Sequence, residues 1–270
     1  MIDDDPDMFR QRKMTDLVVR RTRFRELHAT GCFLLPNPWD IGGAKRLEGM
    51  GFQALVTSSA ASAWAIGKQD YEITVEEALA HIELICHATD LPVNADFETG
   101  FATDPEGVAR NVTRAIATGL AGLSIEDVAG KGLRDRTLAI ECVAAARAAI
   151  DASGENVMLV ARTEGYRIGR PDAKLAIDRL VAFAEAGADC LFAPGVTDLA
   201  TIADMVRAVA PKPLNVILWG PEMKPAELAA IGVRRISAGG ALASKTWATF
   251  DAAAKAFRDA LPGVRGVSLK

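Results

Sequence analysis

Residues 92–127 read PVNADFETGFATDPEGVARNVTRAIATGLAGLSIED and hold one complete strand–helix–strand repeat. The apolar run Pro92–Ala95 predicts a strand, and Thr103 is a suitable N-cap for the amphipathic helix that follows. Gly119 then comes just before a second apolar run, Gly122–Ile125, where a left-handed residue can end the helix and reverse the chain. Alternation of this kind is typical of parallel βα units, so the stretch predicts a parallel sheet covered by helices.

The same alternation extends in both directions and gives eight predicted strands. Eight strands in a chain of about 250 residues are typical of a (β/α)8 barrel of the TIM type, and a doubly wound open sheet is the alternative. We therefore expect a single α/β domain over residues 1–270, a (β/α)8 barrel in which residues 1–30 form an N-terminal helical extension. The predicted strands are Phe33–Leu35, Gln53–Thr57, Pro92–Ala95, Gly122–Ile125, Val157–Ala161, Asp189–Ala193, Leu214–Leu218 and Arg234–Ser237.

The composition argues against several classes of protein. The chain has 270 residues, 50% of them hydrophobic, and a net charge of -4 from interspersed acids and bases, so it carries no basic stripe for nucleic acid. No apolar run approaches the roughly 20 residues of a membrane-spanning helix, and the N-terminus lacks the apolar core of a signal peptide. We expect a cytoplasmic protein that binds neither nucleic acid nor membrane. The chain has four cysteines, Cys32, Cys86, Cys142 and Cys190, and no CxxC pair among them. The sequence therefore suggests neither a zinc site nor a disulfide framework.

Carboxylates follow two neighbouring predicted strands. Asp96 and Glu98 come after the strand that ends at Ala95, and Glu126 and Asp127 come after the next strand. Functional groups of a (β/α)8 barrel lie at the carboxyl ends of its strands, so these acids should meet at one rim, where a cation would relieve their repulsion. Oxygen ligands favour Mg2+ or Mn2+ over zinc. The alternative is that the acids cap helices or pair with arginines, and Asp127 is the first to assign to that role.

The three histidines do not contribute to this rim. His28, His81 and His87 all fall in or near predicted helices, and we expect His81 and His87 to face solvent. A histidine-based triad or zinc site is therefore not expected.

Other polar groups are expected at the same rim. Arg162 ends the fifth strand, and its forked guanidinium suits a carboxylate or a phosphonate. After the second strand, the small side chains of Ser58 and Ser59 leave backbone amides free for an anionic oxygen, although the same motif is equally typical of a turn. The loops at residues 64–71 and 130–134 are candidates for lids over the site.

Taken together, these motifs resemble those of the isocitrate lyase/phosphoenolpyruvate mutase superfamily. They occur in the family's order at the corresponding strands, and the resemblance covers nearly the whole chain from about Phe33 onward. Each motif alone is weak, whereas the ordered set is specific. The motifs are Ser58-Ser59, the loop Gly67–Asp70, Asp96-x-Glu98-Thr99-Gly100, Ile125-Glu126-Asp127 and Ala161-Arg162-Thr163-Glu164.

The resemblance implies an enzyme that uses Mg2+, with Mn2+ as an alternative, and acts on a small α-keto or 2-hydroxy acid through an enolate. It implies that Asp96 binds the metal directly, while Glu98 and Glu126 hold it largely through water. The remaining implied roles are substrate binding by Ser58, Ser59, Gly100, Arg162 and Glu164, and catalysis by Asp70, Arg162 and Lys131.

The segment after the fourth strand departs from the family pattern. Lyases of the superfamily carry a Lys-Lys/Arg-Cys-Gly-His stretch there, whose cysteine serves as the acid or base of carbon–carbon cleavage. Residues 128–134 of this chain read VAGKGLR and contain no cysteine, and Cys142 lies too far into the following helix to substitute. Of the lid residues in the mutase branch, only the lysine has a counterpart, Lys131. This departure argues against isocitrate or methylisocitrate cleavage and gives no better support to phosphonate rearrangement.

Our leading hypothesis is a Mg2+-dependent lyase that decarboxylates a small α-keto or 2-hydroxy dicarboxylate, such as an oxaloacetate-like acid, or cleaves it by a retro-aldol reaction. One alternative is a metal-dependent hydrolase of a carbon–carbon or carbon–phosphorus bond, or a phosphonate mutase. Another is a non-catalytic barrel that binds a ligand. The resemblance also implies a homotetramer in which a C-terminal helix within Leu242–Ala260 is exchanged between subunits.

Overall fold

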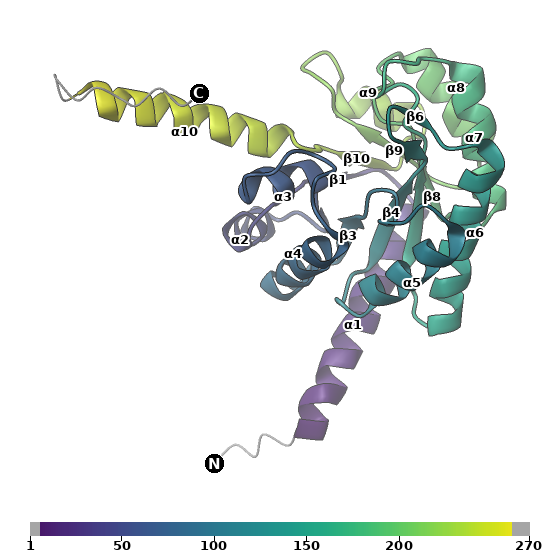
Figure 1. Ribbon diagram of the computed structural model, residues 1–270, viewed down its shortest axis with the longest axis horizontal. Coiled ribbons are helices and arrows are strands. Elements are labelled where there is room, and N and C mark those ends of the chain that lie inside the picture. Colours follow the sequence, from purple (N-terminus) through teal and green to yellow (C-terminus); the bar gives the residue numbers. More distant parts are fainter. Residues whose placement is uncertain (1–5, 261–270) are drawn as a thin grey trace.

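The computed structural model describes residues 6–260 and shows a ring of parallel strands with helices around it (Figure 1). Each predicted strand is present within two residues of its expected bounds. The strands of the ring are β1 (Phe33–Leu35), β2 (Leu55–Val56), β3 (Val93–Asp96), β4 (Gly122–Glu126), β7 (Met158–Arg162), β8 (Cys190–Phe192), β9 (Leu214–Ile217) and β10 (Arg235–Ser237).

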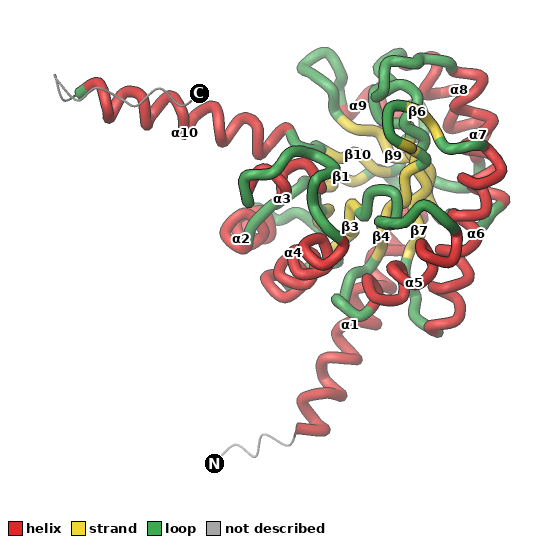
Figure 2. The backbone as a smooth tube through the Cα atoms, in the orientation of Figure 1, coloured by secondary structure: helices red, strands yellow, loops and turns green. Residues whose placement is uncertain are grey.

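Helices surround this ring, apart from α1 (Pro6–Ala29), whose last turns lie at one end of it, and α10 (Ala241–Asp259), which extends away from it, as the tube in Figure 2 shows. The others are α2 (Ile41–Gly49), α3 (Ser59–Ala65), α4 (Val75–Ala88), α5 (Pro105–Ile116), α6 (Arg136–Ser153), α7 (Ala173–Glu185), α8 (Leu199–Val209) and α9 (Pro225–Ala230). None of the helices in residues 6–260 combines the length and the apolar character that crossing a membrane would require.

The strands form a barrel, with the order β1-β10-β9-β8-β7-β4-β3-β2 and parallel pairing throughout. The ring closes just beyond β1, where the Val56 amide donates to the Pro36 carbonyl oxygen over 3.0 Å. The Asn37 side-chain amide adds a second link by donating to the Thr57 carbonyl oxygen over 2.9 Å. The predicted (β/α)8 barrel is confirmed, and the open-sheet alternative is wrong.

Side chains alternate between the two faces of each strand, as the period of two requires. Along β4, Leu123 and Ile125 pack outward against the helices, and on β7 Leu159 does the same. Met158 and Val160 point into the barrel instead. The residues that share the inward parity at the carboxyl ends of these strands therefore face the barrel axis and are available for a site.

The last turns of α1 close the amino-terminal end of the barrel. Phe24 is fully buried and packs edge-on against Phe33, and the buried Arg21 donates to the Leu120 carbonyl oxygen over 3.0 Å. A β-carbon at Gly122 would lie 2.9 Å from the Phe24 ring, so only glycine leaves room for this packing. Closure at this end leaves the opposite end of the barrel for ligands.

The residues expected to begin and end the helices do so in the structure, with one correction. Thr74 and Glu77 form a reciprocal capping box at α4. The side chain that caps α5 is Asp104, one residue after the predicted Thr103, because Pro105 occupies the first turn. The four glycines expected before strands, Gly51, Gly119, Gly187 and Gly232, all have positive φ.

Two short elements were not expected from the sequence. Ser58 caps the short helix α3 through its hydroxyl, so the serine pair is a helix start and not merely a turn. After β4 the chain forms an antiparallel hairpin of β5 (Val128–Ala129) and β6 (Gly132–Leu133). This hairpin is the segment that the sequence marked as a lid.

One histidine expectation is wrong. His81 is half-buried, and its Nε2 lies 2.9 Å from the Trp39 carbonyl oxygen, whereas His87 faces solvent as expected. Burial is the largest influence on His81 and lowers its pKa. Both residues lie on α4, outside the barrel.

Candidate active site

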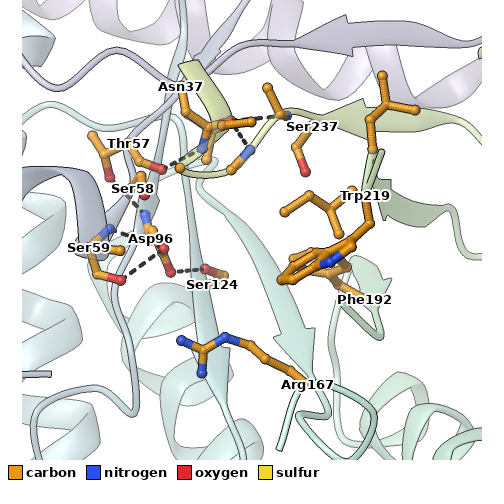
Figure 3. A pocket seen from close by; sticks show the side chains of 18 of the residues that line it. Asn37, Thr57, Ser58, Ser59, Asp96, Ser124, Arg167, Phe192, Trp219 and Ser237 are labelled. Atoms are coloured by element: carbon orange, nitrogen blue, oxygen red, sulfur yellow. Dashed lines mark hydrogen bonds between the residues drawn. The ribbon is translucent and has the colours of Figure 1, made fainter. Parts of the chain in front are cut away.

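A cavity of about 570 Å3 opens at the carboxyl ends of the strands. Figure 3 shows Ser58, Ser59 and Asp96 on one side of it and Phe192 and Trp219 on the other. Polar and charged residues from strand ends and from the loops that follow them are part of the lining. They include Asn37, Thr57, Ser58, Ser59, Asp70, Asp96, Ser124, Glu126, Arg162 and Arg167.

Strand register brings the acids and Arg162 together. Asp96 at the end of β3 is paired with Ser124 on β4, and Glu126 at the end of β4 is paired with Arg162 on β7. Residues opposite one another in a parallel ladder lie at the same height and face the same side of the sheet. Glu126 and Arg162 are therefore level with each other at the rim, and Asp96 lies two residues earlier in the register, from where its carboxylate still reaches Arg162 Nη1 over 2.8 Å.

Asp96 is fixed by the start of α3. The Ser59 amide and the Ser59 hydroxyl each donate to Asp96 Oδ2 over 3.1 Å. The Thr57 hydroxyl accepts from the Asp96 amide over 2.9 Å, which ties the end of β3 to the end of β2. The serine pair thus orients this carboxylate, and the Ser59 amide expected to bind a substrate oxygen is engaged with it here.

Arg162 lies between the carboxylates. Its Nη1 is 2.8 Å from Asp96 Oδ1 and 2.8 Å from Glu126 Oε1, and its Nε donates to Glu164 Oε1 over 2.9 Å. The guanidinium also stacks over the Phe192 ring, 4.9 Å from its centre. A planar, permanently charged group with several donors is suited to holding three acids at once.

Glu98 and Glu126 remain costly to ionise in spite of this cation. Burial raises the pKa of Glu98 to about 8, and the negative charges of Asp96 and Asp70 add to the shift. Burial also raises the pKa of Glu126 well above its usual value, against the opposing effect of Arg162. Glu98 Oε1 is buried without a hydrogen-bond partner among the described residues. Glu98 is not among the residues that line the cavity, but Asp96 and Asp70, whose charges act on it, are. A further cation beside those two residues would relieve Glu98 as well as Glu126.

The loop between α3 and α4 covers these acids. Asp70 pairs with Arg167 and accepts from the Ser59 hydroxyl over 3.3 Å. Tyr71 donates to Glu126 Oε2 over 2.5 Å and accepts from Arg167 Nη1 over 3.0 Å. Tyr71 also has a φ of 68°, which is rare outside glycine and marks a strained turn. These bonds hold the loop closed against the site.

The family model for phosphoenolpyruvate phosphomutase matches residues 24–258, which is most of the chain and includes every strand of the barrel. The chain belongs to the isocitrate lyase/PEP mutase superfamily. The predicted superfamily and the predicted enzyme class, a lyase-type enzyme, are therefore confirmed.

Relatives within the superfamily differ in their reactions. Oxaloacetate decarboxylase of Chromohalobacter salexigens is 31% identical over 261 residues, which cover 92% of this chain and 86% of that protein. 2-Methylisocitrate lyase of Escherichia coli K12 is 35% identical over 168 residues, 59% of this chain and 56% of the lyase. A protein of Burkholderia cenocepacia J2315, whose crystal structure is described only as that of a lyase/mutase, is 41% identical in sequence to this chain. The two structures superpose with a TM-score of 0.87, and the match covers 93% of this chain and 94% of that one.

Some residues expected in the site of this superfamily member lie outside the cavity. Lys131 is exposed at the tip of the β5–β6 hairpin and does not line the cavity. Gly100 is buried with a φ of 76°, and a β-carbon there would lie 3.1 Å from Val108, so it serves the turn after β3. Glu164 is fully buried behind Arg162, where it holds the guanidinium and does not reach the cavity.

Asp127 has the structural role that the sequence allowed for. It pairs with the buried Arg179 over 3.1 Å and accepts from the Glu164 amide over 2.8 Å. Glu126, its neighbour in the chain, points to the opposite side and lines the cavity. The alternation of side chains along the strand thus separates one functional acid from one structural acid.

Sequence reasoning missed Tyr71 and Arg167 as site residues. Tyr71 lies in the loop that was expected to form a lid, but an exposed tyrosine carries no motif of its own. Arg167 follows Glu164 by three residues in the turn after β7, a spacing that could have suggested a second guanidinium at the rim.

The acids fit a divalent cation in chemistry but not as a finished cage. Within residues 6–260, no three acidic, histidine or cysteine side chains are arranged as a ready-made metal site. The unpartnered Glu98 Oε1 and the raised pKa values of Glu98 and Glu126 are the features that a hard cation would relieve. Binding would require Arg162 to release at least one of the two carboxylates that share its Nη1.

Proposed function

We propose that this protein is a Mg2+-dependent lyase that breaks a carbon–carbon bond of a small α-keto or 2-hydroxy dicarboxylate, by decarboxylation or by retro-aldol cleavage. The observation that carries the proposal is that Asp96 and Glu126 both contact Arg162 in a cavity of a chain of this superfamily. Acids for a metal and a guanidinium for a carboxylate are the two requirements for binding such a substrate.

In this proposal Asp96 binds Mg2+ directly, and Glu98 and Glu126 hold it largely through water; Mn2+ would serve in its place. The bound cation would supply the positive charge that stabilises an enolate as the bond breaks. Its arrival would also neutralise Asp96 and Glu126, which frees Arg162 for the substrate carboxylate. The metal and the substrate would therefore bind cooperatively.

The chain's own groups orient the substrate. Ser58 and Ser59 would present their amides to its oxygen atoms, the Ser59 amide only after it releases Asp96 Oδ2. Arg162 would bind the substrate carboxylate with both arms of the guanidinium. Glu164 would act behind Arg162 by holding its Nε. Gly100 would act only through the turn that places Glu98.

Proton transfer is assigned to the two covering segments. In a decarboxylation, the bond to the departing carboxylate breaks, its electron pair forms the enolate, CO2 leaves, and one proton is then added to the enolate carbon. Asp70 lines the cavity, and burial raises its pKa, which suits a proton donor. Lys131 could take part only if the β5–β6 hairpin moves toward the cavity.

The test is turnover with a panel of acids and Mg2+. We expect release of pyruvate from oxaloacetate or from a related acid among methylisocitrate, dimethylmalate and phosphonopyruvate, and loss of activity with EDTA that Mg2+ restores. A matched Asp90→Asn variant should retain full activity, because the Asp90 side chain is exposed, forms an ion pair with Arg20 and does not line the cavity. Absence of turnover with the whole panel, with and without metal, would contradict the proposal.

One observation favours a hydrolase as the second candidate. The lid segment at residues 128–134 has no cysteine to serve as the acid or base of a lyase. A hydrolase would release oxalate and acetate from oxaloacetate, whereas a decarboxylase would release pyruvate and CO2. Product analysis by NMR of the same reaction separates the two.

We also propose that the chain forms a homotetramer that exchanges α10 between subunits. Figure 1 shows α10 extending away from the barrel, and Trp247, Phe250 and Phe257 on it are exposed. Only Ala243 of this helix is buried. Sedimentation analysis should show a tetramer, and the double substitution Phe250→Ser with Phe257→Ser should dissociate it. A monomer at micromolar concentration would contradict this proposal.

A further inference from the structure

The cavity has an apolar half that the proposed chemistry does not use. Its volume of about 570 Å3 lies within the roughly 300–1,000 Å3 typical of pockets that enclose drug-sized molecules. A dicarboxylate as small as oxaloacetate, bound at Asp96 and Arg162, would leave the far side unfilled. Figure 3 shows this far side, with Phe192 and Trp219 facing the acidic side across the cavity.

The apolar half is built by the ends of the last barrel strands. Phe192 ends β8, and Ile217, Leu218 and Trp219 follow one another along β9 and the loop after it. Trp64 of α3 also lines the cavity and lies close to Gly240, in the loop after β10. Phe192 lies directly beside the Arg162 guanidinium, so this apolar lining begins next to the acid-binding groups.

Small residues keep this half open. The lining residues between β10 and α10 are Ala238, Gly239 and Gly240, and Ala241 and Ser244 follow in the first turn of α10. A β-carbon at Gly239 would lie 2.4 Å from Ile217 Cδ1, and one at Gly240 would lie 3.2 Å from Trp64 Cη2. Larger side chains here would displace the apolar walls, so the sequence preserves both the walls and the space between them.

Most of the charged residues that line the cavity lie in its other half. In the described chain, the only charged residue from 217 to 244 that lines the cavity is Arg235. Arg235 is buried, and it donates to Asn215 Oδ1 over 2.9 Å and to Asn94 Oδ1 over 3.3 Å. A second carboxylate directed toward Trp219 would find neutral donors, such as the Ser237 and Ser244 hydroxyls, but no cation beyond the buried Arg235 among the lining residues from 217 to 244. A hydrocarbon group would find aromatic and aliphatic surfaces.

Trp219 is suited to close over such a group. It is 55% exposed, an unusual state for a large aromatic side chain that lines a cavity. Its amide donates to Met223 Sδ over 3.3 Å, which holds the loop in place near the opening. Contact with a ligand would remove the indole from water.

We propose that the substrate of this site carries an apolar substituent, an alkyl chain or an aromatic ring, which extends from the acid group at Asp96 and Arg162 to the wall formed by Phe192, Ile217 and Trp219. This inference rests on the proposed function for the position of the acid group. It adds a preference among acids: the chain selects those with a hydrophobic tail over oxaloacetate itself.

Calorimetric titration with 2-oxo acids in the presence of Mg2+ tests the preference apart from turnover. The series runs from pyruvate through 2-oxobutyrate and 2-oxohexanoate to phenylpyruvate. Burial of each methylene group should raise the affinity about three- to fourfold. Pyruvate, which has no tail, reports on the acid-binding half alone.

Two substitutions bracket the effect. Trp219→Ala removes part of the wall and should flatten the increase in affinity with tail length while leaving the affinity for pyruvate within about twofold. Ser244→Leu should fill the space at the start of α10 and weaken binding of phenylpyruvate more than that of pyruvate. Met50→Ala, which removes a large exposed apolar side chain at the end of α2, is the control and should change neither.

The outcomes separate the two proposals. Affinity that rises with tail length in the unaltered chain and does so less in Trp219→Ala supports the inference. Equal affinity for all members of the series overturns the inference and leaves the proposed function standing. A change in the sedimentation of Trp219→Ala has the same consequence, because the apolar wall would then belong to a contact between copies of this chain. Failure of every 2-oxo acid to bind overturns both.

Discussion

Arg162 Nη1 lies 2.8 Å from Asp96 Oδ1, so the side chain proposed to bind the substrate is held by the side chain proposed to bind the metal. The same nitrogen lies 2.8 Å from Glu126 Oε1. The guanidinium thus supplies the positive charge that the buried carboxylates require. A divalent cation would supply that charge in place of Arg162. The same carboxylates would then be neutralised by Arg162 in the free protein and by the cation in the metal-bound protein.

The first prediction concerns removal of this guanidinium. Arg162→Gln should lower the free energy of unfolding by about 3–5 kcal/mol, because it leaves buried carboxylates without a counter-charge. Addition of Mg2+ should recover part of the loss. Urea denaturation with and without Mg2+ measures both effects. The matched control is Arg136→Gln, whose exposed pair with Asp178 should contribute less than about 1 kcal/mol. If Mg2+ does not reduce the loss of unfolding free energy, Arg162 and the cation do not neutralise the same carboxylates.

The second prediction concerns the metal. At a concentration 100 times its Kd, Mg2+ should stabilise the folded chain by about 2.7 kcal/mol, since it binds the assembled acids and not the unfolded chain. Asp96→Asn should abolish most of this increase. Thermal unfolding with increasing Mg2+ measures it, and Asp90→Asn should respond as the unaltered chain does. If Asp96→Asn gains as much from Mg2+ as the unaltered chain, Asp96 is not a ligand.

Local sequence patterns were sufficient to predict the barrel and the rim at which its acidic side chains lie. The alternation of apolar runs and amphipathic helices is repeated eight times, and each repeat is an independent sign of the same architecture. The position of Asp96, Glu126 and Arg162 at strand ends then follows from parallel topology alone, since all parallel strands end at the same rim. These residues lie inside the strands and not just after them, a difference of one position that keeps them on the inward face.

The contacts among the site residues depend on features that a sequence does not display. The bond from Tyr71 to Glu126 joins residues 55 positions apart and depends on a strained loop conformation. The placement of Lys131 was predicted from a motif, but the hairpin geometry that keeps it exposed follows from the buried Arg134, which donates to the Thr99 carbonyl oxygen over 3.2 Å. Long-range tertiary contacts of this kind override the local pattern.

The third prediction separates the two adjacent acids on β4. Asp127→Asn should destabilise the fold by about 3 kcal/mol, because the buried Arg179 loses its charged partner. Glu126→Gln should change stability less, because it removes a buried carboxylate whose pKa is already raised by burial, while it should reduce turnover strongly. Urea denaturation and turnover of both variants give the comparison. The assignment would be reversed if Asp127→Asn were stable and inactive.

The fourth prediction concerns pH and His28, which is buried where α1 meets the barrel. Its Nδ1 lies 2.7 Å from the Phe24 carbonyl oxygen, and its Nε2 has no partner in the described chain. Burial, followed by the charge of Arg235, lowers the pKa of His28 to about 3, against about 6.5 in an unfolded chain. Between these values the unfolded chain binds more protons than the folded chain, so stability is fully present above about pH 6.5 and is lost as the pH falls toward 3.

His28→Gln should remove this contribution. Below pH 6.5 the unaltered chain should lose up to about 1.4 kcal/mol of unfolding free energy per pH unit from this residue, and the variant should not. Buried acids with raised pKa act in the opposite sense, but they are common to both chains and cancel in the difference between them. Urea denaturation at pH 7 and pH 5 measures that difference. His87→Gln, on the exposed side of α4, is the matched control and should keep the pH dependence of the unaltered chain. Equal slopes for the His28 variant and the unaltered chain would show that α1 accommodates the charged imidazole without separating from the barrel.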